Sequence, residues 1–191
     1  LLENGPFARY LRFLELDDLT AVPFQQEGYD TIRFGDEDRD IRFNAGYGPF
    51  RERLTDLFPN EKKGIGIFVD AVRKFYNNAP FLNEATDIRA EFAEEADYDT
   101  VSVFLHSIIR DPLLRAALSV ASLLHGAPPG EVSFLQHARV LASRIDAPAT
   151  FEGGGMALAD AFARRLGDAG VRVITGNGVS RINSSSGGSV E

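Results

Sequence analysis

The run of three glycines Gly153–Gly155 is the sequence feature that comes nearest to a phosphate-binding motif. Glycines at this spacing before a helix let the backbone approach a pyrophosphate at the helix N-terminus. The flanking residues do not fit a dinucleotide site, because residues 147–152 contain a proline and a charge where an apolar strand is needed. Leu158 occupies the third glycine position, and no acid ends the strand expected at 171–175. We therefore interpret the run as a tight turn into a helix.

Other reactive side chains lack the spacing of a catalytic or metal site. The histidines are His106, His125 and His137, and none has a partner at the spacing that zinc binding or general-base catalysis requires. Ser133 lacks the glycines of a nucleophile elbow and is placed to cap a helix. Cysteine is absent, which excludes disulfides, thiolate metal sites and cysteine nucleophiles. The sequence predicts no catalytic residue and no metal ligand in this chain.

Acidic residues are concentrated in the first hundred positions of this 191-residue chain. That part has 21 acidic and 12 basic residues, residues 101–191 have 7 and 8, and the formal net charge is −8. We interpret the acidic runs at 36–40 and 91–99 as solvated surface rather than metal sites. An acidic chain without a basic patch is a poor nucleic-acid binder, so no nucleic-acid partner is expected. No apolar run is long enough for a membrane span.

The apolar periodicity predicts an α+β fold, in which helices cover a small antiparallel sheet that has one solvated face. Strands are expected at 10–16, 29–34, 40–43, 171–175 and 179–182, the last two joined by a turn. Helices are expected at 49–58, 60–76, 99–109, 111–124, 133–145 and 153–166.

Capping residues mark where several of these helices begin. Asp111 followed by Pro112 is a strong start signal. Asn60 is placed to cap a second helix, and either Asp99 or Thr100 to cap a third. Gly64 and Gly66 each disfavour the helix at 60–76 by about 1 kcal/mol relative to alanine.

Apolar side chains along the helices permit two interpretations. Eight phenylalanines either fill a core, which the sequence favours, or line a pocket for a long apolar ligand. The stretch 101–124 is amphipathic enough to touch a membrane, but its lack of lysine favours an internal helix pair. The eight phenylalanines are Phe50, Phe58, Phe68, Phe75, Phe81, Phe92, Phe104 and Phe134.

Several short motifs follow one another in the order of a known enzyme family. From residue 111 onward they are Asp111-Pro112-Leu113-Leu114-Arg115-x-x-Leu118, Gly126-x-Pro128-Pro129, Phe151-x-x-Gly154-Gly155-Met156, Ala159-Asp160-Ala161, Leu166, Gly170-Val171-x-Val173 and Val179-x-x-Ile182. Upstream is Leu54-x-x-x-Phe58-Pro59-x-Glu61-x-x-x-Ile65-x-x-Phe68. Together they span about two thirds of the chain, from residue 54 to residue 182. The ordered set resembles the flavin-dependent oxidoreductases related to bacterial phytoene desaturase, carotenoid isomerase and retinol saturase.

The resemblance implies that this chain is an internal fragment of an FAD-dependent oxidoreductase. Residues 1–147 would form the substrate-binding insertion, and residues 148–191 a βα return segment toward the FAD-binding domain. In the family, the residue matching Val179 lies on a strand beside the FAD adenine, usually through its backbone. FAD would bind the parent protein, with none expected on this fragment, which is itself expected to be inactive.

The implied parent enzyme removes or moves hydride on an apolar substrate such as a polyene. Its expected partners are that small molecule and the FAD domain, and its expected location is cytoplasmic, with peripheral membrane contact left open. One alternative is a non-catalytic lipid- or partner-binding module that keeps the fold. Another is a free-standing α-helical interaction domain.

Overall fold

The fold is known here from a computed structural model that describes residues 6–16, 18–24, 28–35, 40–79, 99–146 and 148–182. The acidic residues at 36–39 and 91–98, together with Phe81 and Phe92, lie outside the described residues. The described helices are α1 (Pro6–Phe13), α2 (Tyr47–Leu57), η1 (a 3-10 helix, Pro59–Glu61), α3 (Lys62–Asn77), α6 (Val101–Ile108), α7 (Pro112–Ser119), η3 (a 3-10 helix, Val120–His125), α8 (Phe134–Ile145) and α9 (Gly155–Asp168). The strands are β1 (Ala21–Pro23), β2 (Asp30–Arg33), β3 (Asp40–Phe43) and β4 (Ala149–Phe151).

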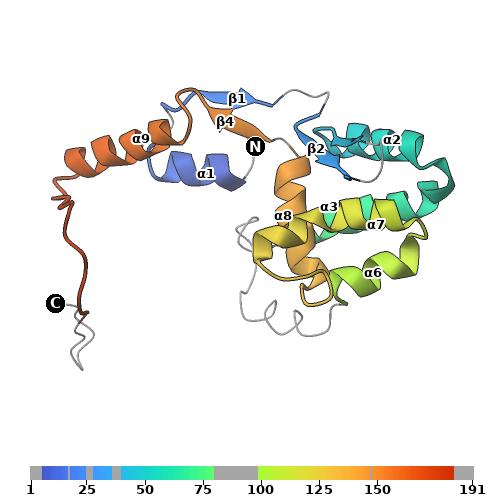
Figure 1. Ribbon diagram of the computed structural model, residues 1–191. Coiled ribbons are helices and arrows are strands. Elements are labelled where there is room, and N and C mark those ends of the chain that lie inside the picture. The colour runs from blue at the N-terminus through green and yellow to red at the C-terminus, as the bar shows by residue number, and fades with distance from the viewer. Residues whose placement is uncertain are drawn as a thin grey trace.

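These elements form the predicted α+β fold, arranged as two side-by-side parts (Figure 1). In the larger part, α2, α3, α6, α7 and α8 pack around one core beside the β2–β3 hairpin. The smaller part contains α1, α9 and the antiparallel pair β1–β4. Because β1 and β4 are 125 residues or more apart in the sequence, the smaller part joins distant segments of the chain. No described helix has the length and apolar character needed to cross a bilayer.

The β2–β3 hairpin confirms the strands predicted near residues 29–34 and 40–43. The two strands pair antiparallel with Asp30 opposite Phe43 and Arg33 opposite Asp40. Ile41 and Phe43 are buried, whereas Arg42 between them is exposed, so one face is solvated as expected.

Two of the predicted capping residues accept hydrogen bonds at helix starts, whereas Ser133 stands at the N-cap position of α8 without a side-chain capping hydrogen bond. The Asp111 carboxylate accepts hydrogen bonds from the backbone N–H groups of Leu113 and Leu114 at 2.9 and 3.0 Å. The Thr100 hydroxyl accepts one from Val103 N at 3.3 Å. The prediction that Asn60 caps α3 is wrong, because residues 59–61 form the 3-10 turn η1 immediately before the helix.

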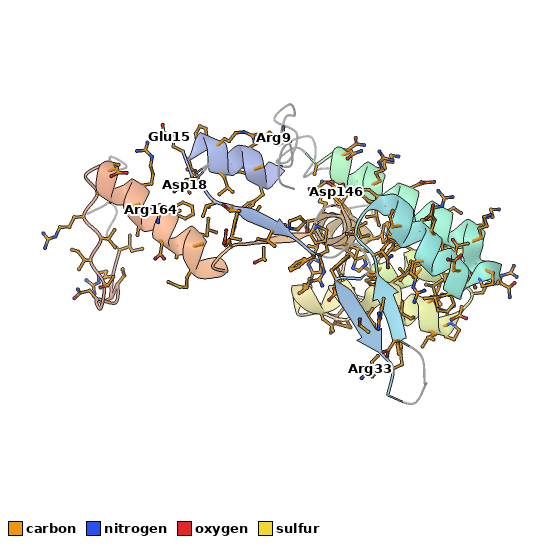
Figure 2. The ribbon with its side chains drawn as sticks, turned by 90° about the horizontal axis from the view of Figure 1, so that it is seen from above. Arg9, Glu15, Asp18, Arg33, Asp146 and Arg164 are labelled. Carbon is orange, nitrogen blue, oxygen red and sulfur yellow. The ribbon has the colours of Figure 1, made fainter. Side chains whose placement is uncertain are left out.

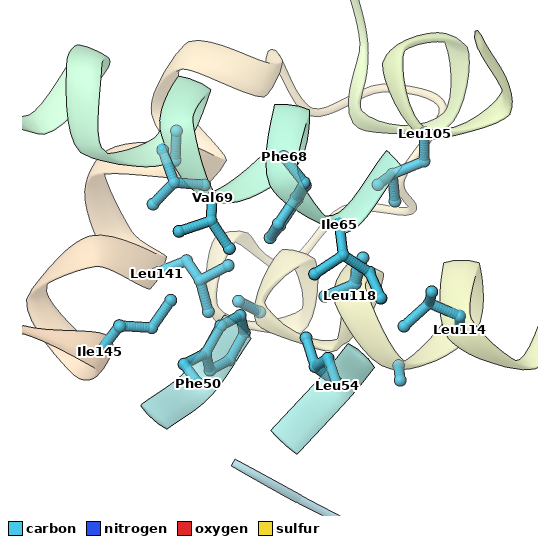
Figure 3. Close-up of a cluster of buried hydrophobic side chains, with 14 of the residues drawn as sticks. Phe50, Leu54, Ile65, Phe68, Val69, Leu105, Leu114, Leu118, Leu141 and Ile145 are labelled. Carbon is cyan, nitrogen blue, oxygen red and sulfur yellow. The ribbon is translucent and has the colours of Figure 1, made fainter. Parts of the chain in front are cut away.

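The phenylalanines that the structure describes belong mainly to the core of the larger part (Figure 3). The Phe104 and Phe134 rings stack with their centroids 3.7 Å apart, and the Phe68 ring meets Phe134 edge-on at 5.9 Å. The core interpretation is therefore confirmed for the buried members and for those partly buried against them: Phe50, Phe58, Phe68, Phe75, Phe104 and Phe134.

A close helix contact at Gly64 holds α3 against the end of α6. A β-carbon at residue 64 would lie 2.1 Å from the Ile108 carbonyl oxygen and 2.7 Å from Ile109 Cδ1. Beside this contact, the buried Glu61 carboxylate accepts hydrogen bonds from the backbone N–H groups of Arg110 and Asp111 at 3.0 and 2.7 Å. The glycine that weakens the helix intrinsically is thus the residue that permits this packing.

Three segments differ from the sequence prediction. Residues 10–13 belong to helix α1 rather than to a strand. The helix predicted to run to residue 124 changes to the 3-10 helix η3 at Val120, which leaves Leu124 exposed instead of on the buried face. Residues 171–182 form no strand within the described chain, because no described strand lies beside them to complete hydrogen-bonded pairs.

Substituting Gly64 with alanine tests the close contact between α3 and α6. Because the added methyl group would overlap the Ile108 carbonyl, we expect Gly64→Ala to lower the free energy of unfolding by about 2–3 kcal/mol in urea denaturation. Gly48→Ala is the matched control, since a β-carbon there meets nothing within 4 Å. We expect the control to change stability by less than about 1 kcal/mol. Equal stability of the two variants would contradict the packing.

Candidate functional site

An apolar groove lies between α1 and the β1–β4 pair. Its volume is about 280 Å³, and its lining comes from α1, from the connection that leads to β1, and from both strands. Arg12 and Thr150 contribute the polar side chains of the lining. The apolar residues lining the groove are Phe7, Ala8, Leu11, Leu16, Leu19, Ala21, Ala149 and Phe151.

Strand pairing between distant segments builds this groove. Ala21 lies opposite Phe151 in the antiparallel β1–β4 pair. Backbone hydrogen bonds extend the pairing at both ends, from Glu152 N to Thr20 O at 2.9 Å and from Phe24 N to Pro148 O at 3.0 Å. The Phe7 and Phe151 rings meet across the groove with centroids 6.1 Å apart and planes inclined by 44°. Apolar surface on two facing elements gives a ligand apolar contacts on opposite sides.

Ion pairs hold α9 beside the α1 end of the groove (Figure 2). Arg164 donates to the Asp18 carboxylate at 2.9 Å, and Arg165 pairs with Glu15. Both pairs are exposed, so each contributes at most about 1 kcal/mol to stability. They link α9 to the residues that follow α1.

The glycine run forms the tight turn between β4 and α9. Gly153 and Gly154 have φ values of 81° and 69°, which side chains disfavour, and Gly154 N donates to Phe151 O at 2.8 Å. The expectation that no strand precedes the run is wrong, because β4 ends at Phe151 despite Pro148 and Glu152 on either side. β4 pairs antiparallel with β1, whereas the dinucleotide-binding motif begins on a parallel strand.

Val179, the one residue predicted to contact a cofactor, lies in the exposed segment 171–182 that follows α9 (Figure 1). Its side chain is 81% exposed. Its backbone N–H and carbonyl make no hydrogen bond within the described residues. The contact of Val179 with an adenine ring stays a prediction.

The three histidines lie apart from the groove. His137 is fully buried, with Nε2 donating to the Leu118 carbonyl at 2.9 Å and Nδ1 lying 3.4 Å from Ser122 Oγ. Burial lowers the pKa of His137 to about 4, so the ring is neutral at pH 7. His106 is exposed and donates from Nδ1 to Ser102 O at 2.7 Å, and His125 is half-buried. No carboxylate contacts any of them in the described part of the chain.

Burial also raises the pKa values of Tyr29 and Tyr47, so their hydroxyls stay protonated. Near Tyr29 the Arg144 guanidinium pairs with the Asp30 carboxylate and ties α8 to β2. No group of three or more potential metal ligands is present among the residues that the structure describes.

The lining of the groove between α1 and the β1–β4 pair is suited to contact and orient an apolar molecule, and it offers no acid–base pair.

The groove residues Phe7 and Phe151 were not singled out as pocket residues by the sequence. Phe7, Leu11 and Leu14 are spaced as on one face of a helix, and this spacing is the signal that was missed. The apolar run at 10–16 favoured a strand instead. Phe151 appears in a family-like motif, but the sequence alone does not reveal that it faces α1.

Comparisons with known proteins were made at the level of sequence families, individual sequences and folds. No protein-family model, curated protein or solved structure matches the chain.

The buried His137 predicts a pH-dependent stability. Its folded-state pKa of about 4 lies below the ordinary value of 6.5, so between these values the unfolded state binds more protons and stability falls as pH falls. We expect this group to remove about 3 kcal/mol between pH 7 and pH 4. His137→Gln should flatten the curve of unfolding free energy against pH in this window, whereas His106→Gln, at an exposed site, should not. Parallel curves for the unsubstituted protein and His137→Gln would contradict the lowered pKa of His137.

Proposed function

We propose that this chain forms the substrate side of an FAD-dependent oxidoreductase related to phytoene desaturase. The enzyme would remove or move hydride on an apolar substrate such as a polyene. The observation that carries the proposal is the apolar groove, which lies next to the segment whose motifs resemble those of the family. A cytoplasmic location is part of the same proposal.

The proposed reaction divides its work between the cofactor and the chain. FAD, when bound by the rest of the enzyme, supplies the redox chemistry. Phe7, Leu11, Leu16 and Phe151 would bind the apolar substrate and exclude water from it. In a desaturation the hydride would pass to FAD, and the proton lost with it would pass to a base or water held by the rest of the enzyme, so this lining would contribute positioning.

The path of the chain after the groove supports contact with a flavin domain. β4 lines the groove, α9 follows it directly, and the exposed residues 171–182 come next. Val171, Val173, Ile174, Val179 and Ile182 in that segment are exposed. We propose that this segment pairs with the sheet of the flavin domain, which would cover these side chains and bring the Val179 backbone beside the adenine.

A non-catalytic lipid- or partner-binding module is the second candidate. The same groove favours it, since an apolar lining without reactive groups suits binding as well as catalysis. The two candidates differ in whether the protein that contains this chain binds FAD.

Two substitutions at Val179 test the flavin contact in that longer protein. Val179→Pro removes the backbone N–H, so we expect the flavin-to-protein ratio, measured from the visible spectrum, to fall about tenfold. Val179→Ala keeps the backbone and should retain flavin. Thermal unfolding of both variants checks that the fold is intact. If the longer protein, without substitutions, purifies without flavin and cannot be reconstituted with FAD, the proposed function is refuted. If Val179→Pro retains its full flavin content, only the role of residue 179 is refuted.

A further inference from the structure

The turn Gly176-Asn177-Gly178 lies in the exposed segment 171–182 and contains a chemically labile pair of residues. Because Asn177 is followed by glycine, no β-carbon on residue 178 shields the side-chain carbonyl carbon of Asn177 from the Gly178 backbone nitrogen. A bond between these two atoms closes a five-membered ring. Asn177–Gly178 is the asparagine–glycine pair of the described chain, since the other pair, Asn4–Gly5, lies outside the described residues.

The backbone around Gly178 leaves its nitrogen open to this ring closure. The Gly178 N–H makes no hydrogen bond within the described residues, and a β-carbon built on Gly178 meets nothing within 4 Å. Residues 175–180 are exposed and belong to no helix or strand in the described chain. A backbone N–H that is paired in a helix or sheet is held in place, and this restraint is missing at Gly178.

A single hydrogen bond positions the Asn177 side chain. Asn177 Nδ2 donates to Thr175 O at 3.2 Å, across Gly176 with its φ of 75°. The distance is at the long end of the range for such bonds, and the bond is exposed to water, so it opens at little cost in free energy. Asn44 differs on both counts, because Ala45 follows it and its side-chain oxygen is buried.

We propose that Asn177–Gly178 is a self-modification site, at which Asn177 converts to aspartate and isoaspartate through a succinimide. The Gly178 nitrogen forms a bond to Asn177 Cγ and loses its proton to water. The Cγ–Nδ2 bond breaks as Nδ2 takes up a proton and leaves as ammonia. Water then opens the ring, at Cγ to give aspartate or at the main-chain carbonyl carbon to give isoaspartate. No oxidant, reductant or cofactor takes part.

The products change both the charge and the backbone of the segment 171–182. The segment has two basic residues, Arg172 and Arg181, and no acidic residue, so either product halves its formal charge. Isoaspartate also adds a carbon to the main chain, which shifts the side-chain alternation on one side of residue 177 relative to the other. This inference goes beyond the proposed flavin chemistry and does not depend on it, because the reaction needs only these residues and water.

Incubation of the chain in mildly alkaline buffer, followed by peptide mapping, tests the proposal. Trypsin cuts after Arg172 and Arg181, so peptide 173–181 has Asn177 as its only asparagine, and peptide 43–51 has Asn44. We expect the mass change from asparagine to aspartate to appear at Asn177 at least about tenfold faster than at Asn44. An isoaspartyl methyltransferase should label peptide 173–181. A sample digested before incubation corrects for reaction during handling.

Three variants test the ring closure itself. Gly178→Ala places a methyl group beside the attacking nitrogen in open space, so we expect the rate at Asn177 to fall about tenfold with the fold intact. Asn177→Gln would need a six-membered ring and should stay unmodified over the same period. Gly130→Ala is the matched control, since a β-carbon there also meets nothing within 4 Å, and it should leave the rate at Asn177 unchanged.

Four results would overturn the proposal. They are equal rates at Asn177 and Asn44, an unchanged rate in Gly178→Ala, aspartate without isoaspartate, which would indicate direct hydrolysis, and a rate at Asn177 at least about tenfold lower in the folded chain than in guanidinium chloride. The last result would show that the folded conformation restrains the pair. Flavin content enters none of these measurements, so this proposal and the proposed function fail separately.

Discussion

The close approach of α3 to the end of α6 is the constraint on which the larger part of the structure depends. It requires a residue without a β-carbon at position 64, because the Ile108 carbonyl occupies that space. Glu61 secures the same junction by accepting the N–H groups of Arg110 and Asp111, and Asp111 in turn begins α7. Gly64 lowers the intrinsic helix propensity of α3, but it permits a contact among α3, α6 and α7 that orders the core.

The smaller part is held together by fewer contacts, which join segments far apart in the sequence. Three residue pairs join β1 to β4, and exposed ion pairs link α9 to the end of α1. This pairing creates the apolar groove and sets the course of the chain toward residues 171–182. The two parts therefore have different roles: the larger supplies a rigid core, and the smaller supplies the surfaces that we propose meet the substrate and the flavin domain.

Sequence patterns within a few residues predicted the features that depend on neighbouring residues alone, such as helix caps and alternating strands. Asp111 and Thr100 cap helices as expected, and alternating apolar residues predicted β2 and β3. Prediction failed where a partner distant in sequence decides the structure. β4 has only three residues and follows Pro148, so it is a strand only because β1 lies beside it. The groove was missed for the same reason, while 171–182 has the pattern of strands without a described strand to pair with.

The central claim is that the groove between α1 and the β1–β4 pair binds an apolar polyene. A fluorescence titration with cis-parinaric acid, a polyene fatty acid, tests this claim most directly. Ala8→Trp fills this groove, whereas Ala116→Trp places the same side chain in a separate groove beside η3. The account predicts saturable binding to the parent and to Ala116→Trp, with affinity lowered about tenfold or more in Ala8→Trp. Absence of binding to the parent, or equal affinity in Ala8→Trp, would contradict it.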